Sequence, residues 1–151
     1  MSDDMLADRN AALSLKDSAF SDAQLRQFVE LINGADPGAD TPVPLPITIV
    51  ADGAIITGGL ISYARFIRTF SAMYGLDEMY AGYAERSERE AAKHLKEPHP
   101  SQVPSFLHLQ DARFVTGPAG TVPSEGDGML LRVRLSAVTS WSFLTLATTK
   151  K

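Results

Sequence analysis

The chain has 151 residues, of which 44% are hydrophobic, which suits one folded domain and is too short for two of ordinary size. Fourteen Lys and Arg against eighteen Asp and Glu give a net charge of −4, which argues against binding to DNA or to a membrane surface. The absence of cysteine excludes disulfides, thiolate nucleophiles and cysteine-ligated metal sites. Without a long apolar run or a signal-peptide pattern at the N-terminus, the sequence predicts a soluble cytoplasmic protein.

The N-terminal third predicts one helix between two irregular segments. Residues 1–20 are polar and weakly patterned, and we expect a flexible arm there. Ser21 and Gln24 have the spacing of a capping box, and Asn33-Gly34 is a typical helix stop. The apolar residues between them share one helical face: Leu25, Phe28, Val29 and Ile32. Four prolines then favour an extended connector up to Pro46.

The segment from Ile47 to Ile61 predicts a β-hairpin, because Asp52-Gly53 lies between two β-branched runs and tolerates the positive φ of a tight turn. A two-residue turn pairs Ala51 with Ala54, Val50 with Ile55, Ile49 with Ile56, and Thr48 with Thr57. Since apolar residues then point to both faces, we expect both faces to be covered. Gly58-Gly59 indicates a bulge or sharp bend in the second strand.

Two helices and three strands are predicted in the rest of the chain. Ser62 is a candidate N-cap of the first helix, which Gly75 would end, and Asp77 is a candidate N-cap of the second. The strands are expected at 106–116, 129–135 and 141–147, separated by a flexible loop (Gly117 to Gly128) and a short turn at Thr139-Ser140.

No motif in the sequence supports catalysis or metal binding. The three histidines, His94, His99 and His108, fit no zinc spacing, and no G-x-S-x-G elbow is present. Gly53 and Gly58 have the gap of a phosphate-binding loop, but its Lys and Ser/Thr are missing. The Ser124–Gly128 loop has two acidic residues, too few for calcium. We therefore predict no catalytic residue, no cofactor and no metal.

Arg132, Arg134 and Trp141 are the candidate partner-binding residues. The alternation from Met129 to Leu135 directs both arginines to one face of a strand, and Trp141 could lie across from that strand. Arginine beside an aromatic ring is a common anchor of protein interfaces. The plainer alternative is that the arginines face solvent and the tryptophan is part of the core.

Three stretches resemble the GvpU family of gas vesicle accessory proteins: ITIVADGAIITGGLISYARFIRTF (Ile47 to Phe70), FLHLQDARFVTG (Phe106 to Gly117) and LLRVRLSAVTSWSFLTLA (Leu130 to Ala147). The resemblance spans about residues 47 to 147, and the first helix and the proline connector look additional to it. It implies an accessory, non-shell protein linked to vesicle clustering and condensate-like self-association. It implies no catalytic residues.

A second resemblance concerns the fold alone. A helix, an Asp-Gly hairpin and a closing strand pair are similar to an Sm-like barrel. We therefore expect a single α+β domain over residues 21–147: a small, strongly bent five-stranded antiparallel sheet or Sm-like barrel. An N-terminal helix precedes it, a two-helix insert (62–96) separates strands 2 and 3, and residues 148–151 form a tail.

The expected function is that of a non-enzymatic gas vesicle accessory protein. Its expected partners are the gas vesicle shell or other gas vesicle proteins, together with copies of itself, and it binds neither DNA nor membrane. The alternative is an Sm-like RNA-binding or scaffolding module, and a small hydrolase is a third, less favoured class.

Overall fold

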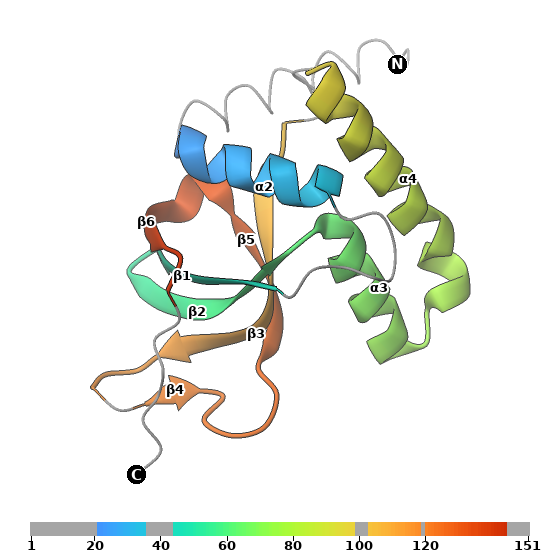
Figure 1. The fold of residues 1–151 in the computed structure, drawn as a ribbon. Coiled ribbons are helices and arrows are strands. Elements are labelled where there is room, and N and C mark those ends of the chain that lie inside the picture. Colours follow the sequence, from blue (N-terminus) through green and yellow to red (C-terminus); the bar gives the residue numbers. More distant parts are fainter. Residues whose placement is uncertain (1–20, 36–43, 99–102, 119, 145–151) are drawn as a thin grey trace, which may run out of the picture.

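The computed structural model describes residues 21–35, 44–98, 103–118 and 120–144, so the predicted arm and tail, most of the connector and His99 lie outside the described residues. The described part is an α+β fold, as expected (Figure 1). Its three helices are α2 (Ala23–Ala35), α3 (Tyr63–Tyr74) and α4 (Asp77–Lys96). Its strands are β1 (Leu45–Ala51), β2 (Ala54–Ile61), β3 (Phe106–Val115), β4 (Thr121–Val122), β5 (Met129–Arg134) and β6 (Val138–Ser142).

The β1–β2 hairpin has the predicted register, with all four predicted pairs in place. Asp52 and Gly53 take positive φ values of 49° and 80° at the turn, which explains why this dipeptide occurs there. The expectation that both faces are covered is wrong near the turn, because Ile49 is fully buried whereas Ile55 is 39% exposed. At the other end of β2 the neighbours Leu60 and Ile61 are both buried, so there both faces are covered.

The predicted irregularity at Gly58-Gly59 is confirmed. The ladder between β2 and β3 shifts register between Thr57 and Gly59. A Cβ atom on Gly58 would lie 3.0 Å from the Cα of Ala112 on β3. The glycine therefore allows the two backbones to approach each other closely.

The sheet is antiparallel and open, with the order β4-β3-β2-β1-β6 and β5 paired with β3. It has six strands rather than five, because a two-residue strand, β4, forms within the segment predicted as a loop. Strands β5 and β6 lie at opposite ends of the sheet and are joined by a 3-10 turn, η2 (Leu135–Ala137). No ladder closes β5 onto β6 in the part of the chain that the structure describes, so a closed Sm-like barrel is not confirmed.

The last strand begins earlier than predicted. The predicted turn at Thr139-Ser140 lies inside β6, and the chain turns instead at η2. Leu135 explains the difference, because its side chain is fully buried and its backbone N–H donates to the carbonyl of Ser105. A buried side chain and a long-range hydrogen bond fix this turn, and neither is visible in the local sequence.

Helix α2 covers the core of the sheet (Figure 1). Leu25 and Val29 of this helix are buried against apolar side chains of the strands and of η2. These side chains are Ile47, Ile49, Ala51, Ile56, Leu60, Leu107, Leu109, Ala112, Val133, Leu135 and Val138. The predicted capping box is wrong: the carboxylate of Asp22, not Ser21, accepts a hydrogen bond from the Leu25 N–H at 2.8 Å. The helix also continues through Asn33-Gly34 to Ala35.

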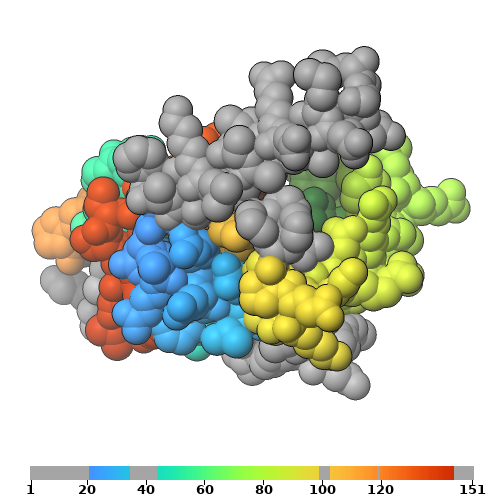
Figure 2. All heavy atoms as spheres, turned by 90° about the horizontal axis from the view of Figure 1, so that it is seen from above, coloured from blue at the N-terminus to red at the C-terminus, as the bar shows by residue number. Residues whose placement is uncertain are grey.

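The two helices of the insert lie between β2 and β3 in the chain, as predicted. Ser62 caps α3 by accepting a hydrogen bond from the Arg65 N–H, and Gly75 ends it with a φ of 66°. Asp77 is not the N-cap of α4 but its first residue, where its charge favours the helix dipole. Helix α4 packs against both α3 and α2, and Figure 2 shows its C-terminal end beside α2.

Candidate functional site

The two predicted arginines share one aromatic ring. Strand β5 pairs with β3 so that Arg134 lies opposite Phe106 and Arg132 opposite His108. The guanidinium carbon of Arg132 lies 3.8 Å from the centroid of the Phe106 ring, and that of Arg134 lies 5.5 Å from it. These are cation–π distances, so one ring holds two positive charges on the face of the sheet away from the core.

Trp141 lies elsewhere. It pairs with Ile49 on β1, and its ring packs edge-on against Phe28 of α2 at 5.8 Å and against Phe143 at 5.2 Å. The side chain is half-buried and packs against the core. The structure thus brings Arg132 and Arg134 together, whereas the ring contacts of Trp141 in the described part of the chain are with Phe28 and Phe143.

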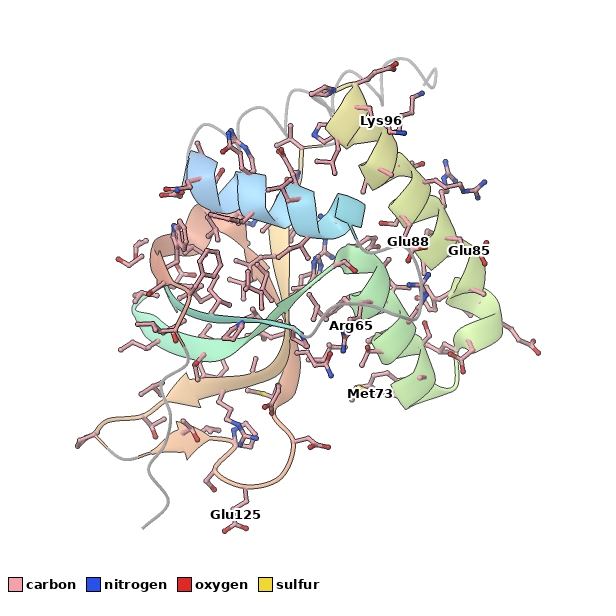
Figure 3. All side chains as sticks on the ribbon, in the orientation of Figure 1. Arg65, Met73, Glu85, Glu88, Lys96 and Glu125 are labelled. Atoms are coloured by element: carbon pink, nitrogen blue, oxygen red, sulfur yellow. The ribbon has the colours of Figure 1, made fainter. Side chains whose placement is uncertain are left out.

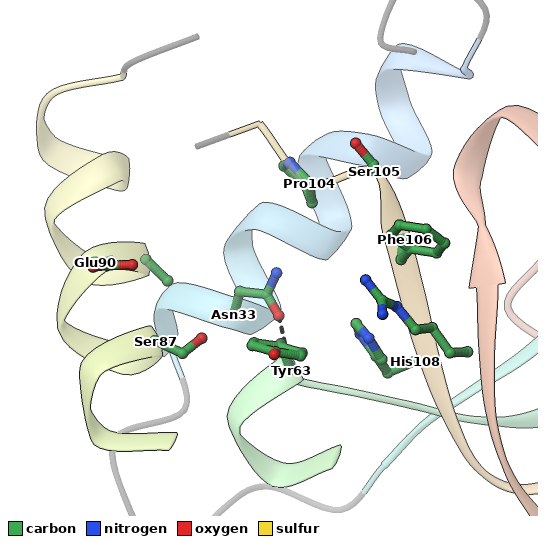
Figure 4. Close-up of a pocket in the computed structure, with 10 residues that line it drawn as sticks. Asn33, Tyr63, Ser87, Glu90, Pro104, Ser105, Phe106 and His108 are labelled. Atoms are coloured by element: carbon green, nitrogen blue, oxygen red, sulfur yellow. Dashed lines mark hydrogen bonds between the residues drawn. The ribbon is translucent and has the colours of Figure 1, made fainter. Parts of the chain in front are cut away.

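A cavity of about 280 Å³ lies between α2, α4 and the first half of β3, at the start of α3 (Figure 4). Arg132 lines it, and Arg134 does not. The neutral polar groups of its wall come from four different segments: Asn33, Tyr63, Ser87, Ser105 and His108. Phe106, Pro104 and Ala91 add apolar surface.

Two helix ends fix the shape of this cavity. The Asn33 side chain at the end of α2 accepts a hydrogen bond from the backbone N–H of Tyr63, at 2.9 Å. Ser62 caps the same helix end by accepting from Arg65. These bonds satisfy two of the N–H groups that the start of α3 leaves without helical partners. They anchor α2 to α3 and place the ring of Tyr63 on the cavity wall.

His108 is the most unusual residue of the cavity. Its neighbours Leu107 and Leu109 point into the core, so His108 points to the opposite face of β3, which α3 covers. There its ring lies 5.2 Å from that of Tyr63 and 4.6 Å from that of Phe66. The residue is only 4% exposed, and neither ring nitrogen has a hydrogen-bond partner among the described residues.

The charge state of His108 follows from its surroundings. Burial, with a further contribution from the positive charge of Arg132, lowers the pKa of His108 from 6.5 to about 3. Both causes disfavour the imidazolium form. At neutral pH the ring is therefore uncharged and offers one N–H donor and one acceptor nitrogen.

His94 and the acidic loop before β5 lie apart from this cavity. His94 is buried on α4, with its Nε2 3.9 Å from a carboxylate oxygen of Glu30 on α2. Within the described ranges no group of three or more His, Asp or Glu residues could hold a metal ion. No helix in the same part of the chain is long and apolar enough to cross a membrane. The loop before β5 is attached to β3, since Asp111 accepts from the Gly128 N–H and Arg113 donates to the Pro123 carbonyl.

The cavity itself, and the place of Asn33, Tyr63 and Phe106 in its wall, do not follow from the sequence pattern. The sequence pattern identifies Asn33 only as a helix stop and gives His108 no role, since the three histidines fit no zinc spacing. One signal was present: His108 lies between two leucines in a strand, at the position that a helical insert can cover. When a helix covers such a position, the ring nitrogens of the histidine are removed from water and need hydrogen-bond partners within the protein or from a ligand.

Comparison with known proteins gives one match. No curated protein and no solved structure shows significant similarity to the chain. A family model described as gas vesicle protein GvpU-like matches residues 22–146. The matched region includes α2 and the connector, which looked additional in the sequence alone. Because the match covers most of the chain, the protein belongs to the GvpU-like family of gas vesicle proteins.

Proposed function

We propose that the protein is a non-enzymatic accessory protein of gas vesicles in the cytoplasm. It acts by binding the vesicle shell or other gas vesicle proteins and by self-association. Membership of the GvpU-like family over residues 22–146 is the observation that carries this proposal. Two exposed surfaces of the fold support a role in protein contacts.

The first surface is the region around the turn between α3 and α4. Its four large exposed side chains, here called the methionine–tyrosine patch, are Met73, Tyr74, Met79 and Tyr83. These four side chains are between 59% and 65% exposed. Figure 3 shows Met73 at the end of α3 that faces away from α2. Large exposed apolar side chains are frequent at interaction sites, and methionine adapts to partners of different shape.

The second surface is the arginine pair, Arg132 and Arg134, on the ring of Phe106. The ring holds both guanidinium groups in defined positions, which lowers the entropy lost when they bind carboxylates. An acidic segment of a gas vesicle protein would suit this surface. Trp141, the third predicted residue, would belong to a separate contact beside α2.

The test is co-flotation of purified protein with gas vesicles. We expect wild-type protein in the buoyant layer, and less of the double variant Arg132→Glu/Arg134→Glu. The double variant Lys93→Glu/Lys96→Glu is the matched control, because it makes the same change in charge at exposed positions of α4. Both should melt close to the wild type, since exposed substitutions shift stability by about 0.5 kcal/mol or less.

The outcomes separate the parts of the proposal. Wild-type protein that neither floats with vesicles nor self-associates in sedimentation experiments would refute the function. If both double variants lose flotation equally, net charge rather than the arginine pair is responsible. If only a Met73→Ser/Tyr83→Ser variant loses self-association, the methionine–tyrosine patch is the contact between copies.

One observation favours the alternative, an Sm-like RNA-binding module. Two arginines on a half-buried aromatic ring of a sheet combine the basic and aromatic groups that bind single-stranded RNA. The net charge of −4 works against it. Protein purified without nuclease would show a high ratio of absorbance at 260 to 280 nm if RNA were bound, and nuclease would then lower it.

A further inference from the structure

The cavity between α2, α4 and β3 has the features of a ligand site, and none of them depends on the proposed gas vesicle function. We propose that this cavity binds a small organic carboxylate with an apolar body. Arg132 and His108 would hold the carboxylate, and the rings of Phe106 and Tyr63 would enclose the apolar part.

The first support is the unsatisfied imidazole of His108. Both ring nitrogens lack partners among the described residues although the side chain is almost completely buried, and it lines the cavity. A buried polar group without a partner destabilises a fold, and an apolar side chain of similar shape would avoid this. Both nitrogens are shielded from solvent in this conformation, so a ligand in the cavity would supply the missing partner once the ring turns toward it.

The second support is the position of Arg132. It lies opposite His108 in the β3–β5 ladder, so the guanidinium and the imidazole project from the same face of the sheet. Stacking on Phe106 orients the guanidinium plane, and no carboxylate in the described ranges lies within ion-pair distance of it. A planar guanidinium beside a neutral imidazole N–H matches the two oxygens of a carboxylate.

The third support is the size and lining of the cavity. Its volume of about 280 Å³ is at the lower end of ligand pockets. Inorganic anions would leave the apolar surfaces of Phe106, Tyr63 and Pro104 uncovered. Among the described residues of the wall, the one carboxylate is that of Glu90. It is already paired with Arg86 at 2.9 Å, which reduces its repulsion of an anion.

The experiment uses the full chain and a matched pair of probes, phenylacetate and its neutral amide phenylacetamide. Binding is followed by NMR through the ring nitrogens of ¹⁵N-labelled histidine and by isothermal titration calorimetry. We expect phenylacetate to shift the His108 ring signals and to bind at least about tenfold more tightly than the amide, because only the carboxylate uses the charge of Arg132.

Two variants of matched chemistry test the residues. Arg132→Gln should weaken phenylacetate binding about tenfold, whereas Arg134→Gln, which touches the same ring but lies outside the cavity, should change it less than about twofold. His108→Phe should abolish binding while its melting temperature stays equal or rises. If His108→Phe does not fold, the two arginine variants still decide the matter.

Several results would overturn the proposal. One is the absence of any His108 shift with phenylacetate up to roughly 10 mM, a concentration at which even a weak site is occupied. Equal binding of phenylacetamide would show that charge plays no part. Equal binding of inorganic phosphate would reduce the site to general anion attraction, and equal loss in both arginine variants would place the anion outside the cavity.

Discussion

The buried His108 makes a sharp prediction about the dependence of folding stability on pH. Its pKa is lowered to about 3 in the folded protein, by burial and by Arg132, against 6.5 in an unfolded chain. Between these values the unfolded chain takes up a proton at this site and the folded protein does not. The free energy of unfolding must therefore fall as the pH is lowered from 6.5 toward 3, and it is unaffected by this group above 6.5.

The size of the effect follows from the two pKa values. At pH 5 the unfolded histidine is almost fully protonated and the folded one almost fully neutral, so the protein loses about 2 kcal/mol relative to pH 7.5. Other groups of the chain also contribute to the dependence of stability on pH. The contribution of His108 is therefore isolated by comparison with His108→Phe, which keeps an aromatic ring beside Tyr63 and Phe66 and cannot titrate.

The assay is urea unfolding of wild type and His108→Phe at pH 7.5 and pH 5. The loss of stability between the two pH values should be about 2 kcal/mol smaller in the variant than in the wild type. At pH 7.5 the variant should equal or exceed the wild type, because it removes two unsatisfied ring nitrogens. Parallel losses in both proteins would show that His108 is solvated in the folded state, and the account of the cavity wall would then be wrong.

Three further predictions concern local structure. Gly53→Val should lower the free energy of unfolding by about 1–2 kcal/mol because φ is positive there, and Gly53→Asn, which tolerates that φ, should cost clearly less; equal melting of both would sink the tight-turn assignment. Ser62→Ala should cost about 1 kcal/mol through loss of the α3 cap, with the exposed Ser124→Ala as a neutral control in the same urea titration. Phe70→Ala should lower the free energy of unfolding by about 1–3 kcal/mol, because Phe70 is half-buried among rings of α3 and α4. Removal of a fully buried phenylalanine side chain costs about 3–5 kcal/mol. A loss of that size in calorimetry would mean that Phe70 belongs to the core.

The parts of the fold that the sequence predicted are those that local chemistry determines. The register of the hairpin follows from Asp52-Gly53, and both ends of α3 follow from Ser62 and Gly75. Each of these features depends on a few neighbouring residues. The alternation of side chains along β5, which directs Arg132 and Arg134 away from the core, also depends only on neighbouring residues.

The features that were not predicted depend on residues far apart in the chain. The turn at η2 requires the bond from Leu135 to Ser105, and β4 forms only because the end of β3 is available beside it. The cavity likewise needs Asn33, Tyr63 and His108, which come from three separate elements. A single sequence shows which residues suit a strand or a cap, but not which distant elements they meet.

The stack of Phe28 on Trp141 and Phe143 has a consequence for how the protein folds during synthesis. It joins the first helix of the described fold to its last strand, so the helix cannot reach its final partners until nearly the whole domain has left the ribosome. At roughly 5–20 residues per second this takes several seconds, during which the apolar face with Leu25 and Val29 lacks part of its native cover. Contacts of such high sequence separation also slow folding after release. The nascent chain should therefore be a substrate for chaperones that bind amphipathic helices, and this dependence should end once β6 has been made.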